Sequence, residues 1–456
     1  MPLNIDTFLT QFSRQILDNR VSLFLGAGGS SDAGYPTWKN LFTPCAQTLK
    51  LDINKCEDYY LLAQYYSNKF GKSELKKIID NEINKNNYES ILLQEIVNIG
   101  FVNIWTTNFD NAIEKNYEIQ NIPYNKIFED TQLPNLDLYK KINIFKMNGD
   151  IKSIDKIIAT KDDYEMYKDT HKMMSTFFRR ELVSSTFLFI GYSFKDNLVL
   201  ESLYEIKKYL GDSANIHYTI MKKEDNNPYF DYFIEDLEKR YGIQVLLVRE
   251  YEEITDILKK LNEKISKKKV FISGAFSTSN SIIENFSHDF SKKLVEQLYK
   301  NDYRIVNGIG RRFGTHLIGY ANEYLVKNAY KNIDKYLIIT PFVNNTNDAA
   351  EFKRKSREKI IKKCGTAIFV FGDTDKNSVN SYSGVMEEFG IACDNNKTII
   401  PISCQSMISE KIWKEVKDNI TKYPYLEKNI DKLKSTENPE LLSKIIVDIL
   451  DSIQEK

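Results

Sequence analysis

The stretch Val21-Ser-Leu-Phe-Leu-Gly-Ala-Gly-Gly-Ser-Ser-Asp-Ala-Gly-Tyr-Pro36 decides how the first half of the chain folds. Residues 21–25 are mostly apolar and have the length of a buried strand, and the glycines after them end that strand in a turn. Such a turn, followed by a helix that begins near Pro36, can bring backbone amides close to a diphosphate. Because Ser31 departs from the G-x-G-x-x-G spacing, an ordinary glycine-rich βα connection remains the alternative to a nucleotide site.

Three later turns follow predicted strands in the same way. They are residues 107–110, 148–150 and 191–193, after strands predicted at 102–105, 143–147 and 186–190. Parallel strands end at a common sheet edge, where such sheets bind ligands, so we expect the turns to meet there. Asn108 suits a ribose hydroxyl, whereas Thr107 or Asp110 serves equally well as the cap of a helix at 111–117.

A group of helices separates the first two predicted strands. A helical stripe at 8–17 precedes the first strand, and helices are predicted at 38–49, 59–66, 75–83 and 90–99. This insert is larger than a minimal βαβ unit needs. It either covers the nucleotide or packs as a separate subdomain.

The second half begins a new alternating series. Strands are predicted at 270–273, 303–306, 336–339, 366–371 and 398–402, with helices at 281–299, 349–363, 384–392 and 441–453. The fold class is therefore α/β, with two Rossmann-like, doubly wound parallel-sheet domains at 1–265 and 269–456, the first with a helical insert. The lysines at 267–269 are interpreted as a solvated hinge between them.

Charge and composition narrow the function classes. The 456 residues hold 63 Lys and Arg against 63 Asp and Glu, which gives no electrostatic case for a nucleic acid or an anionic membrane. There is neither an apolar run of membrane-spanning length nor a signal-like N-terminus, so a soluble, cytoplasmic protein is expected. Five scattered cysteines without a C-x-x-C pair predict neither disulfides nor a metal site.

The ordered motifs of the first half resemble those of sirtuin-type NAD-binding domains. The matching segments are Gly26-Ala27-Gly28, Thr107-Asn108-Phe109-Asp110, Lys146-Met147-Asn148-Gly149-Asp150 and Gly191-Tyr192-Ser193. This resemblance implies NAD⁺ as the substrate, with the diphosphate at the glycine turn and the nicotinamide ribose at Asn108 and Asp110. The residues it assigns to NAD⁺ are Gly26, Ala27, Gly28, Ser30, Ser31, Asp32, Thr107, Asn108, Asp110, Gly191 and Ser193.

Two departures from the sirtuin pattern limit the chemistry. Deacetylating sirtuins carry a four-cysteine zinc module, but no cysteine lies between Cys56 and Cys364, so a zinc-free deacylase is the least favoured function. The family's catalytic histidine would fall at position 148, which is Asn148 here. The implied catalytic residues are thus Asn108, Asp110 and Asn148. An amide cannot accept a proton, and loss of a general base costs about 10²–10⁴ in rate, so we expect NAD⁺ binding to persist and hydrolysis to be weak.

The turns of the second half resemble those of the SLOG family of nucleotide-sensing domains. They are Ser273-Gly274-Ala275 and the turn that contains Gly308. Guanidinium groups bind phosphates well, and carboxylates bind ribose hydroxyls well. For some of the candidate side chains that follow, the alternative is that they lie on the solvent-facing side of a charged helix. The candidate side chains are Arg354, Arg357, Lys376, Glu387 and Glu388.

The order of a sirtuin-like domain before a SLOG-like domain resembles the effectors of the Thoeris antiphage defence system. That resemblance implies an NAD⁺ hydrolase that is activated by a cyclic ADP-ribose isomer, which a TIR-domain partner protein makes on infection, and that depletes NAD⁺ to arrest the cell. It also implies a homo-oligomer, either a tetramer or a filament. The alternative function is a catalytically silent nucleotide-binding or assembly module, which Asn148 favours.

Overall fold

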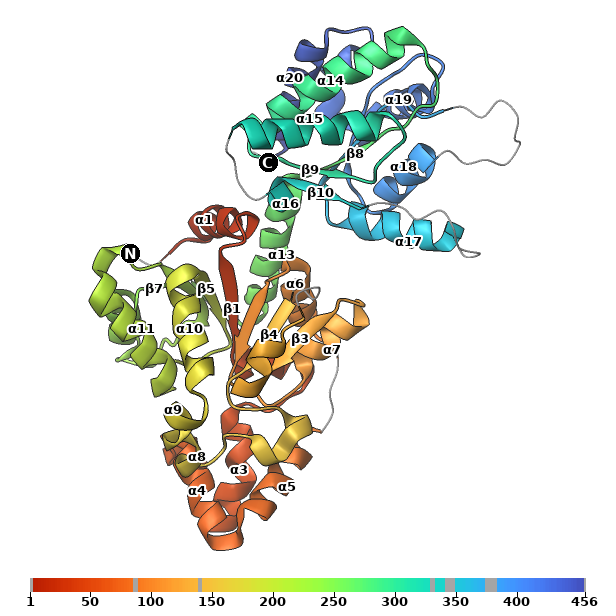
Figure 1. Cartoon of the computed structure of the whole chain (residues 1–456). Helices are drawn as coiled ribbons and strands as arrows, with labels where there is room; N and C mark the ends of the chain where they lie inside the picture. Colours follow the sequence, from red (N-terminus) through yellow and green to blue (C-terminus); the bar gives the residue numbers. More distant parts are fainter. Residues whose placement is uncertain are drawn as a thin grey trace. The chain divides into compact units, whose positions relative to one another are not determined.

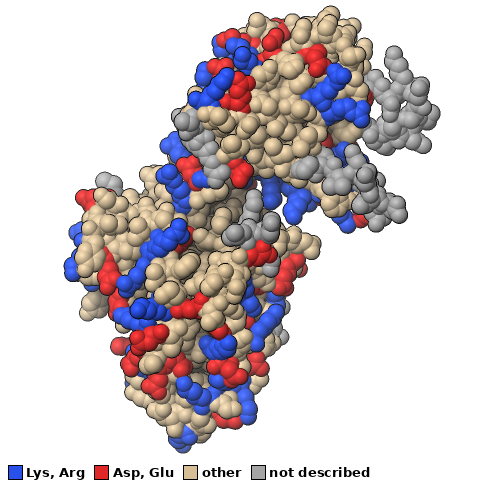
Figure 2. Space-filling view, viewed as in Figure 1, with Lys and Arg blue, Asp and Glu red and all other residues tan. Residues whose placement is uncertain are grey.

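The computed structural model describes residues 3–84, 89–137, 142–328, 333–340, 349–373 and 384–454. The chain divides into two compact units, Met1–Asn262 and Glu263–Lys456, and each is built around its own parallel sheet (Figure 1). On the face of the N-terminal unit in Figure 2, acidic and basic side chains are interspersed. Among the helices of the described residues, none combines the length and the apolar content that a bilayer span requires.

The N-terminal sheet has seven parallel strands in the order β3-β4-β2-β1-β5-β6-β7. Strands β1 and β5 lie at its centre and have every residue buried, as strands covered on both faces do. The chain runs outward from β1 on one side and returns to β5 on the other, so the order reverses between these two strands. The strands are β1 (Val21–Leu25), β2 (Asn103–Thr106), β3 (Tyr124–Ile127), β4 (Ile142–Lys146), β5 (Thr186–Ile190), β6 (His217–Lys222) and β7 (Ile243–Val248).

Helices cover this sheet and extend beyond one end of it. Figure 1 shows α3, α4 and α5 grouped beyond that end, where the helical insert was predicted. The helices are α1 (Ile5–Leu17), α2 (Ala27–Ser30), α3 (Trp38–Leu49), α4 (Tyr59–Phe70), α5 (Lys72–Ile83), α6 (Ile91–Ile99), α7 (Ala112–Ile119), α8 (Lys161–Glu165), α9 (Tyr167–Thr170), α10 (Lys172–Ser184), α11 (Asn197–Leu210), α12 (Phe230–Tyr241) and α13 (Glu252–Lys267).

Local side-chain caps fix where the helices of the insert begin. The side chains of Thr37, Asp58 and Ser90 each accept a hydrogen bond from a backbone N–H in the first turn of α3, α4 and α6. Each such cap satisfies an amide that the helix leaves without a partner and is worth about 1 kcal/mol. The positions of these polar residues therefore determine where α3, α4 and α6 begin.

The C-terminal unit contains a smaller parallel sheet in the order β10-β9-β8-β11-β12. Its order reverses between β8 and β11, so it is doubly wound like the first. The strands are β8 (Lys269–Ser273), β9 (Arg304–Asn307), β10 (Leu337–Ile339), β11 (Thr366–Phe369) and β12 (Thr398–Pro401), and the helices are α14 (Ser281–Lys300), α15 (Phe313–Lys327), α16 (Ile333–Tyr336), α17 (Ala349–Lys362), α18 (Gly384–Asp394), α19 (Ile408–Asp418) and α20 (Pro439–Gln454).

The lysine-rich segment between the two series is not the solvated hinge that the sequence suggested. Helix α13 continues to Lys267 and β8 begins at Lys269, so only Lys268 lies outside regular structure. All three lysines are partly buried. The amine of Lys268 donates to Asn301 O at 3.2 Å and lies 4.2 Å from the centre of the Tyr303 ring. The long alkyl stems pack against the protein while the amines find carbonyl partners.

Candidate active site

The four predicted turns lie at one edge of the N-terminal sheet. Their strands, β4, β2, β1 and β5, are consecutive neighbours and all parallel, so their carboxyl ends line up. This arrangement confirms the expectation drawn from the order of strands and turns. It also places the glycine turn beside the point where the strand order reverses, which is where open α/β sheets bind ligands.

The glycine turn after β1 packs backbone to backbone on the turn after β5. Gly26 N donates to Ile190 O at 2.9 Å, and Gly28 N donates to Gly191 O at 3.0 Å. Gly191 has φ +64°, and a Cβ atom on it would lie 2.0 Å from Gly29 N. The close approach of the two turns therefore requires glycine there, whether or not a nucleotide binds. The helix that opens at the turn, α2, has only four residues.

A chain of polar side chains runs from the glycine turn to the turn after β2. Asn108 Nδ2 donates to Ser30 Oγ at 3.1 Å, and Ser30 Oγ donates to Asp110 Oδ1 at 3.3 Å. Asp110 Oδ1 also accepts from Ala112 N, the first residue of α7, at 2.9 Å, although the N-cap position of that helix is Asn111. Burial raises the pKa of Asp110, and the charge of Lys146 opposes that rise in part.

Asn108 carries the clearest sign of a missing partner in this site. Its side chain is 5% exposed, and its Oδ1 atom has no hydrogen-bond partner among the described residues. The large majority of buried side-chain polar atoms have a hydrogen-bond partner, so an acceptor without one requires a reason. Asn108 also lines a cavity at this sheet edge, and an amide oxygen without a partner is suited to accept from a ligand hydroxyl.

Side chains of the sheet edge and of the insert close that cavity. It is lined by Ala27, Pro36, Trp38, Leu41, Ile83, Asn108, Phe109 and Asp110, and it encloses about 20 Å³. This volume suits about one water molecule. Three of the lining residues, Trp38, Leu41 and Ile83, come from α3 and α5, so the insert borders the cavity.

The insert also supplies a partner to Asn148. Asn148 is 2% exposed, and its Nδ2 atom donates to Tyr60 Oη, on α4, at 2.8 Å. The Tyr60 ring lies between Trp38 and Tyr164, with centroid distances of 4.9 Å and 4.6 Å. Tyr164 in turn donates to Asp196 at 2.8 Å. Asn148 thus contacts Tyr60, which packs against aromatic rings from α3 and α8.

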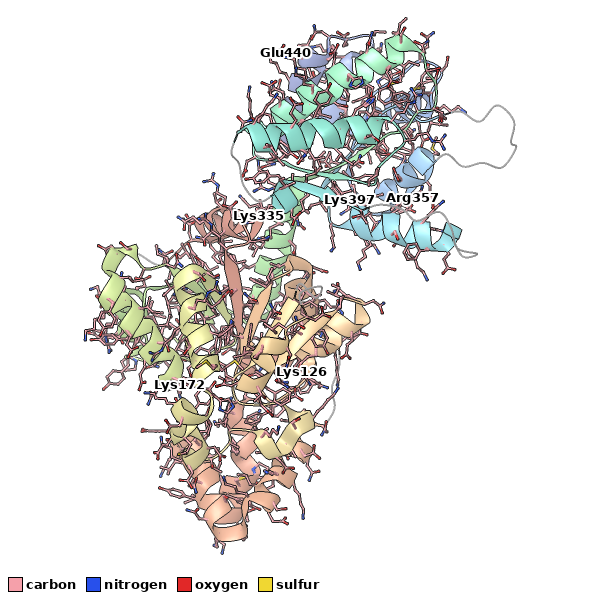
Figure 3. All side chains as sticks on the ribbon, in the orientation of Figure 1. Lys126, Lys172, Lys335, Arg357, Lys397 and Glu440 are labelled. Carbon is pink, nitrogen blue, oxygen red and sulfur yellow. The ribbon has the colours of Figure 1, made fainter. Side chains whose placement is uncertain are left out.

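A buried cation underlies the turn that holds Asn108. Lys146 Nζ is fully buried and lies 3.0 Å from Glu114 and 2.8 Å from Asp150. It also donates to the carbonyl oxygens of Phe109, at 3.1 Å, and of Asp110. Burial alone raises the pKa of Asp150, but the charges of Lys146 and Lys126 outweigh burial and lower that pKa. Figure 3 labels Lys126, which approaches the same carboxylate from β3 at 3.0 Å.

The remaining residues predicted to bind NAD⁺ have mixed surroundings. Ala27 lines the cavity, and Thr107 is buried. Ser31 and Ser193 are exposed, and Ser31 Oγ donates to Gly28 O at 2.7 Å. Asp32 accepts from Ser90 Oγ at 2.6 Å, a bond that ties the turn to the start of α6. Their contacts with NAD⁺ stay predictions.

In the second unit, the predicted ligand residues at the sheet edge form one cluster. Ser273 Oγ, at the end of β8, donates to Glu388 Oε2 at 2.5 Å. Arg357 Nε donates to Glu388 Oε1 at 3.2 Å, and its Nη1 atom pairs with Glu387. Figure 3 shows Arg357 where α17 faces α18. Burial raises the pKa of Glu388, and the bonds to Ser273 and Arg357 oppose that rise.

The other residues of this predicted site are placed less closely together. Gly274 and Ala275 follow Ser273, and the buried Gly308 follows β9. Arg354 is exposed on α17, as the solvent-face alternative expected. Lys376 lies outside the described residues.

These folds and sites define the class of protein: a SIR2-like unit joined to a SLOG unit. A family model of the SIR2-like domain matches residues 102–246, and a model of the Sir2- and TIR-associating SLOG family matches residues 253–453. The first match spans the turns that contain Asn108, Asn148 and Gly191. The second includes every residue of the Ser273–Arg357–Glu388 cluster.

Whole-chain relatives carry both units. The chain is 30% identical over 455 residues to "NAD(+) hydrolase ThsA" of Bacillus cereus (strain MSX-D12), which covers 96% of this chain and 95% of that protein. It is also 30% identical over 482 residues to the protein of the same name from Enterococcus faecium, with 98% of each covered, and 30% identical over 455 residues to that from Cytobacillus dafuensis, with 93% and 90% covered. The chain belongs to the ThsA family.

Proposed function

We propose that this chain is an NAD⁺ glycohydrolase, with the nicotinamide riboside in the cavity beside Asn108. The observation that carries the proposal is the orphaned Asn108 Oδ1 atom, buried between the glycine turn and the turn that contains Asn148. The name of the relatives, NAD(+) hydrolase, supports the same assignment. Polar groups that converge in a closed pocket at this edge suit the orientation of a ribose.

In the reaction, the bond between ribose C1′ and the nicotinamide nitrogen breaks, and water adds to C1′ as a proton is released. The nicotinamide ring is cationic in NAD⁺ and becomes neutral when it leaves, so its departure needs no acid catalyst. The oxocarbenium-like transition state instead needs positioning and electrostatic stabilisation. Asn108 holds a ribose hydroxyl, and Asp110 supplies negative charge near the developing cation. Asn148 holds a hydroxyl or the attacking water by hydrogen bonding. It accepts no proton, so turnover is slow in this chain.

Replacement of Asn108 by alanine is expected to abolish turnover. The change removes the acceptor that orients the ribose, and loss of one such contact costs about 10²–10³ in rate. Hydrolysis of a fluorogenic NAD⁺ analogue, with nicotinamide release measured by chromatography, tests this expectation in the wild-type chain and in Asn108→Ala.

Asn98→Ala is the matched control, because Asn98 is an exposed asparagine on α6. Equal turnover in wild type and Asn108→Ala would refute the assigned site. If the wild-type chain binds NAD⁺ without any hydrolysis, even with residue 148 changed to histidine, the catalytically silent binding module is the correct function instead.

The C-terminal unit is proposed to sense a cyclic ADP-ribose isomer, made by a TIR-domain partner, through Ser273, Arg357 and Glu388. Glu388 is buried and suits a ribose hydroxyl, while the Arg357 fork suits a phosphate once it exchanges Glu387 for the ligand. The signal switches the enzyme only when it binds the active arrangement better than the resting one. We further propose that the chain works as a homo-oligomer in antiviral defence and depletes NAD⁺ when activated.

Arg357→Ala is expected to abolish the response to this signal and to leave NAD⁺ affinity unchanged. The substitution removes the guanidinium that bridges α17 to both carboxylates of α18. Lys355→Ala is the control, because Lys355 is exposed on the same helix and is not a candidate ligand residue, and this variant should respond as the wild type does. Calorimetric titration of each variant with NAD⁺ and with the cyclic nucleotide checks both parts. Normal activation of Arg357→Ala would rule out this site.

A further inference from the structure

Two histidines and a glutamate gather between α14 and α15 in the C-terminal unit, and none of the three is among the predicted nucleotide-binding residues. Glu284 and His288 are one turn apart on α14, and His316 is on α15. Residues at i and i+4 lie on one face of a helix, so the first two point the same way. One ligand atom from each of the three residues lies within 4.8 Å of the other two. All three side chains are partly buried.

Each of the two imidazoles makes a hydrogen bond through its own Nδ1 atom. Ser287 Oγ lies 2.8 Å from His316 Nδ1, and Tyr320 Oη lies 3.2 Å from His288 Nδ1. The two rings are nearly parallel, with centroids 3.8 Å apart and 24° between their planes. When the Nδ1–H of each ring donates to its hydroxyl partner, the ring is fixed and Nε2 keeps the lone pair that a metal requires. Metal-binding histidines have this arrangement, in which the second ring nitrogen is hydrogen-bonded to an outer group.

The distance between the carboxylate and one imidazole also fits a shared ion. Glu284 Oε1 lies 3.4 Å from His316 Nε2. Two tetrahedral ligands at about 2.0 Å from zinc are about 3.3 Å apart. Glu284 Oε2 is held by Arg312 Nη1 at 2.9 Å, which fixes the carboxylate and leaves Oε1 facing the histidines.

We propose that Glu284, His288 and His316 form a binding site for a divalent transition metal such as zinc, with a fourth position open to water. Two imidazoles and one carboxylate are ligands that suit zinc, cobalt or nickel rather than magnesium or calcium. The site joins α14 to α15, and Arg312 connects its carboxylate to the turn that contains Gly308. Nothing in the sequence spacing indicates this cluster, because its third ligand is 28 residues beyond the second.

The test uses the untagged full-length chain, stripped with EDTA, and Zn²⁺ alone as the probe. Competition with a chromophoric chelator should give one tight Zn²⁺ site per chain. His288→Asn and His316→Asn each remove a ligand while keeping a polar atom near the position of Nδ1. Each should weaken Zn²⁺ binding at least about 10-fold, since even outer groups of metal sites contribute that much. Thermal melting of the wild type should rise with Zn²⁺, because a ligand that binds the folded state stabilises it.

Glu296→Gln removes a carboxylate from the same helix that lies eight residues beyond His288 and pairs with Lys300, and this variant should bind Zn²⁺ like the wild type. A Co²⁺ absorption spectrum of the wild type provides a second measurement that needs no variant, and it should show nitrogen and oxygen ligands without thiolate charge-transfer bands. Three results would each overturn the proposal. They are no tight Zn²⁺ binding by the wild type, Zn²⁺ binding by His288→Asn and by His316→Asn that is as tight as in the wild type, and thiolate bands in the Co²⁺ spectrum.

Discussion

Asn148→His is expected to raise NAD⁺ turnover by at least about 100-fold, which corresponds to about 2.7 kcal/mol off the activation barrier. A neutral imidazole at this position can take a proton that an amide cannot. The surroundings are already arranged for a ring nitrogen, since the Tyr60 hydroxyl lies 2.8 Å from the present Nδ2 atom. Steady-state nicotinamide release, with and without the cyclic nucleotide, measures the gain.

Asn148→Gln separates proton transfer from side-chain size. Glutamine extends the side chain but has no basic nitrogen, so it should not exceed the wild-type rate. The gain in Asn148→His should also follow the titration of a single base and disappear when the imidazole is protonated at low pH. If histidine gives no gain although NAD⁺ still binds, position 148 does not activate water, and the catalytic role assigned to it is wrong.

The sheet and its ligand edge were predictable because their signals are local. Strand β5 (Thr186–Ile190) is five buried residues bounded by polar and glycine positions, and its predicted bounds match the structure. Strand β3 (Tyr124–Ile127) was missed, since its four residues alternate in burial at the sheet edge and have no apolar run. The short α2 was also unexpected, because the glycines that permit the tight turn are poor helix formers.

The candidate site shows a similar division between local and distant information. Asn108, Asp110 and Asn148 stand in turns after strands, which predicts that they lie at the ligand edge, whereas the catalytic role of position 148 comes from the sirtuin resemblance and stays a prediction. Tyr60 reaches Asn148 from 88 residues away, and nothing near it in the sequence indicates that contact. Lys146 belongs to one of the sirtuin-like motifs, but its role cannot be predicted from the sequence, because that role depends on carbonyl oxygens and carboxylates from other elements.

Lys146 is the residue on which the shape of the turn after β2 most depends. Its amine joins two carbonyl oxygens of that turn to Glu114, on α7, and to Asp150. Burial lowers the pKa of Lys146, but the nearby carboxylates outweigh burial and raise it, so the amine stays charged. A buried ion pair adds little net stability compared with an apolar replacement of both partners. Removal of one partner leaves the other charge buried and alone.

Lys146→Met is therefore expected to destabilise the N-terminal unit by about 3–5 kcal/mol and to weaken NAD⁺ binding. Asp150 keeps Lys126, but Glu114 loses the cation 3.0 Å away, so Glu114→Gln in the same chain should recover much of the loss. Lys126→Met is the matched control, because this lysine reaches the same carboxylate with 23% of its side chain exposed, whereas Lys146 is fully buried, so Lys126→Met should cost clearly less stability. Urea unfolding followed by tryptophan fluorescence in a Trp413→Phe background reports this unit through Trp38 and Trp105. Equal losses for the two lysines would show that burial of Lys146 is not what makes it important.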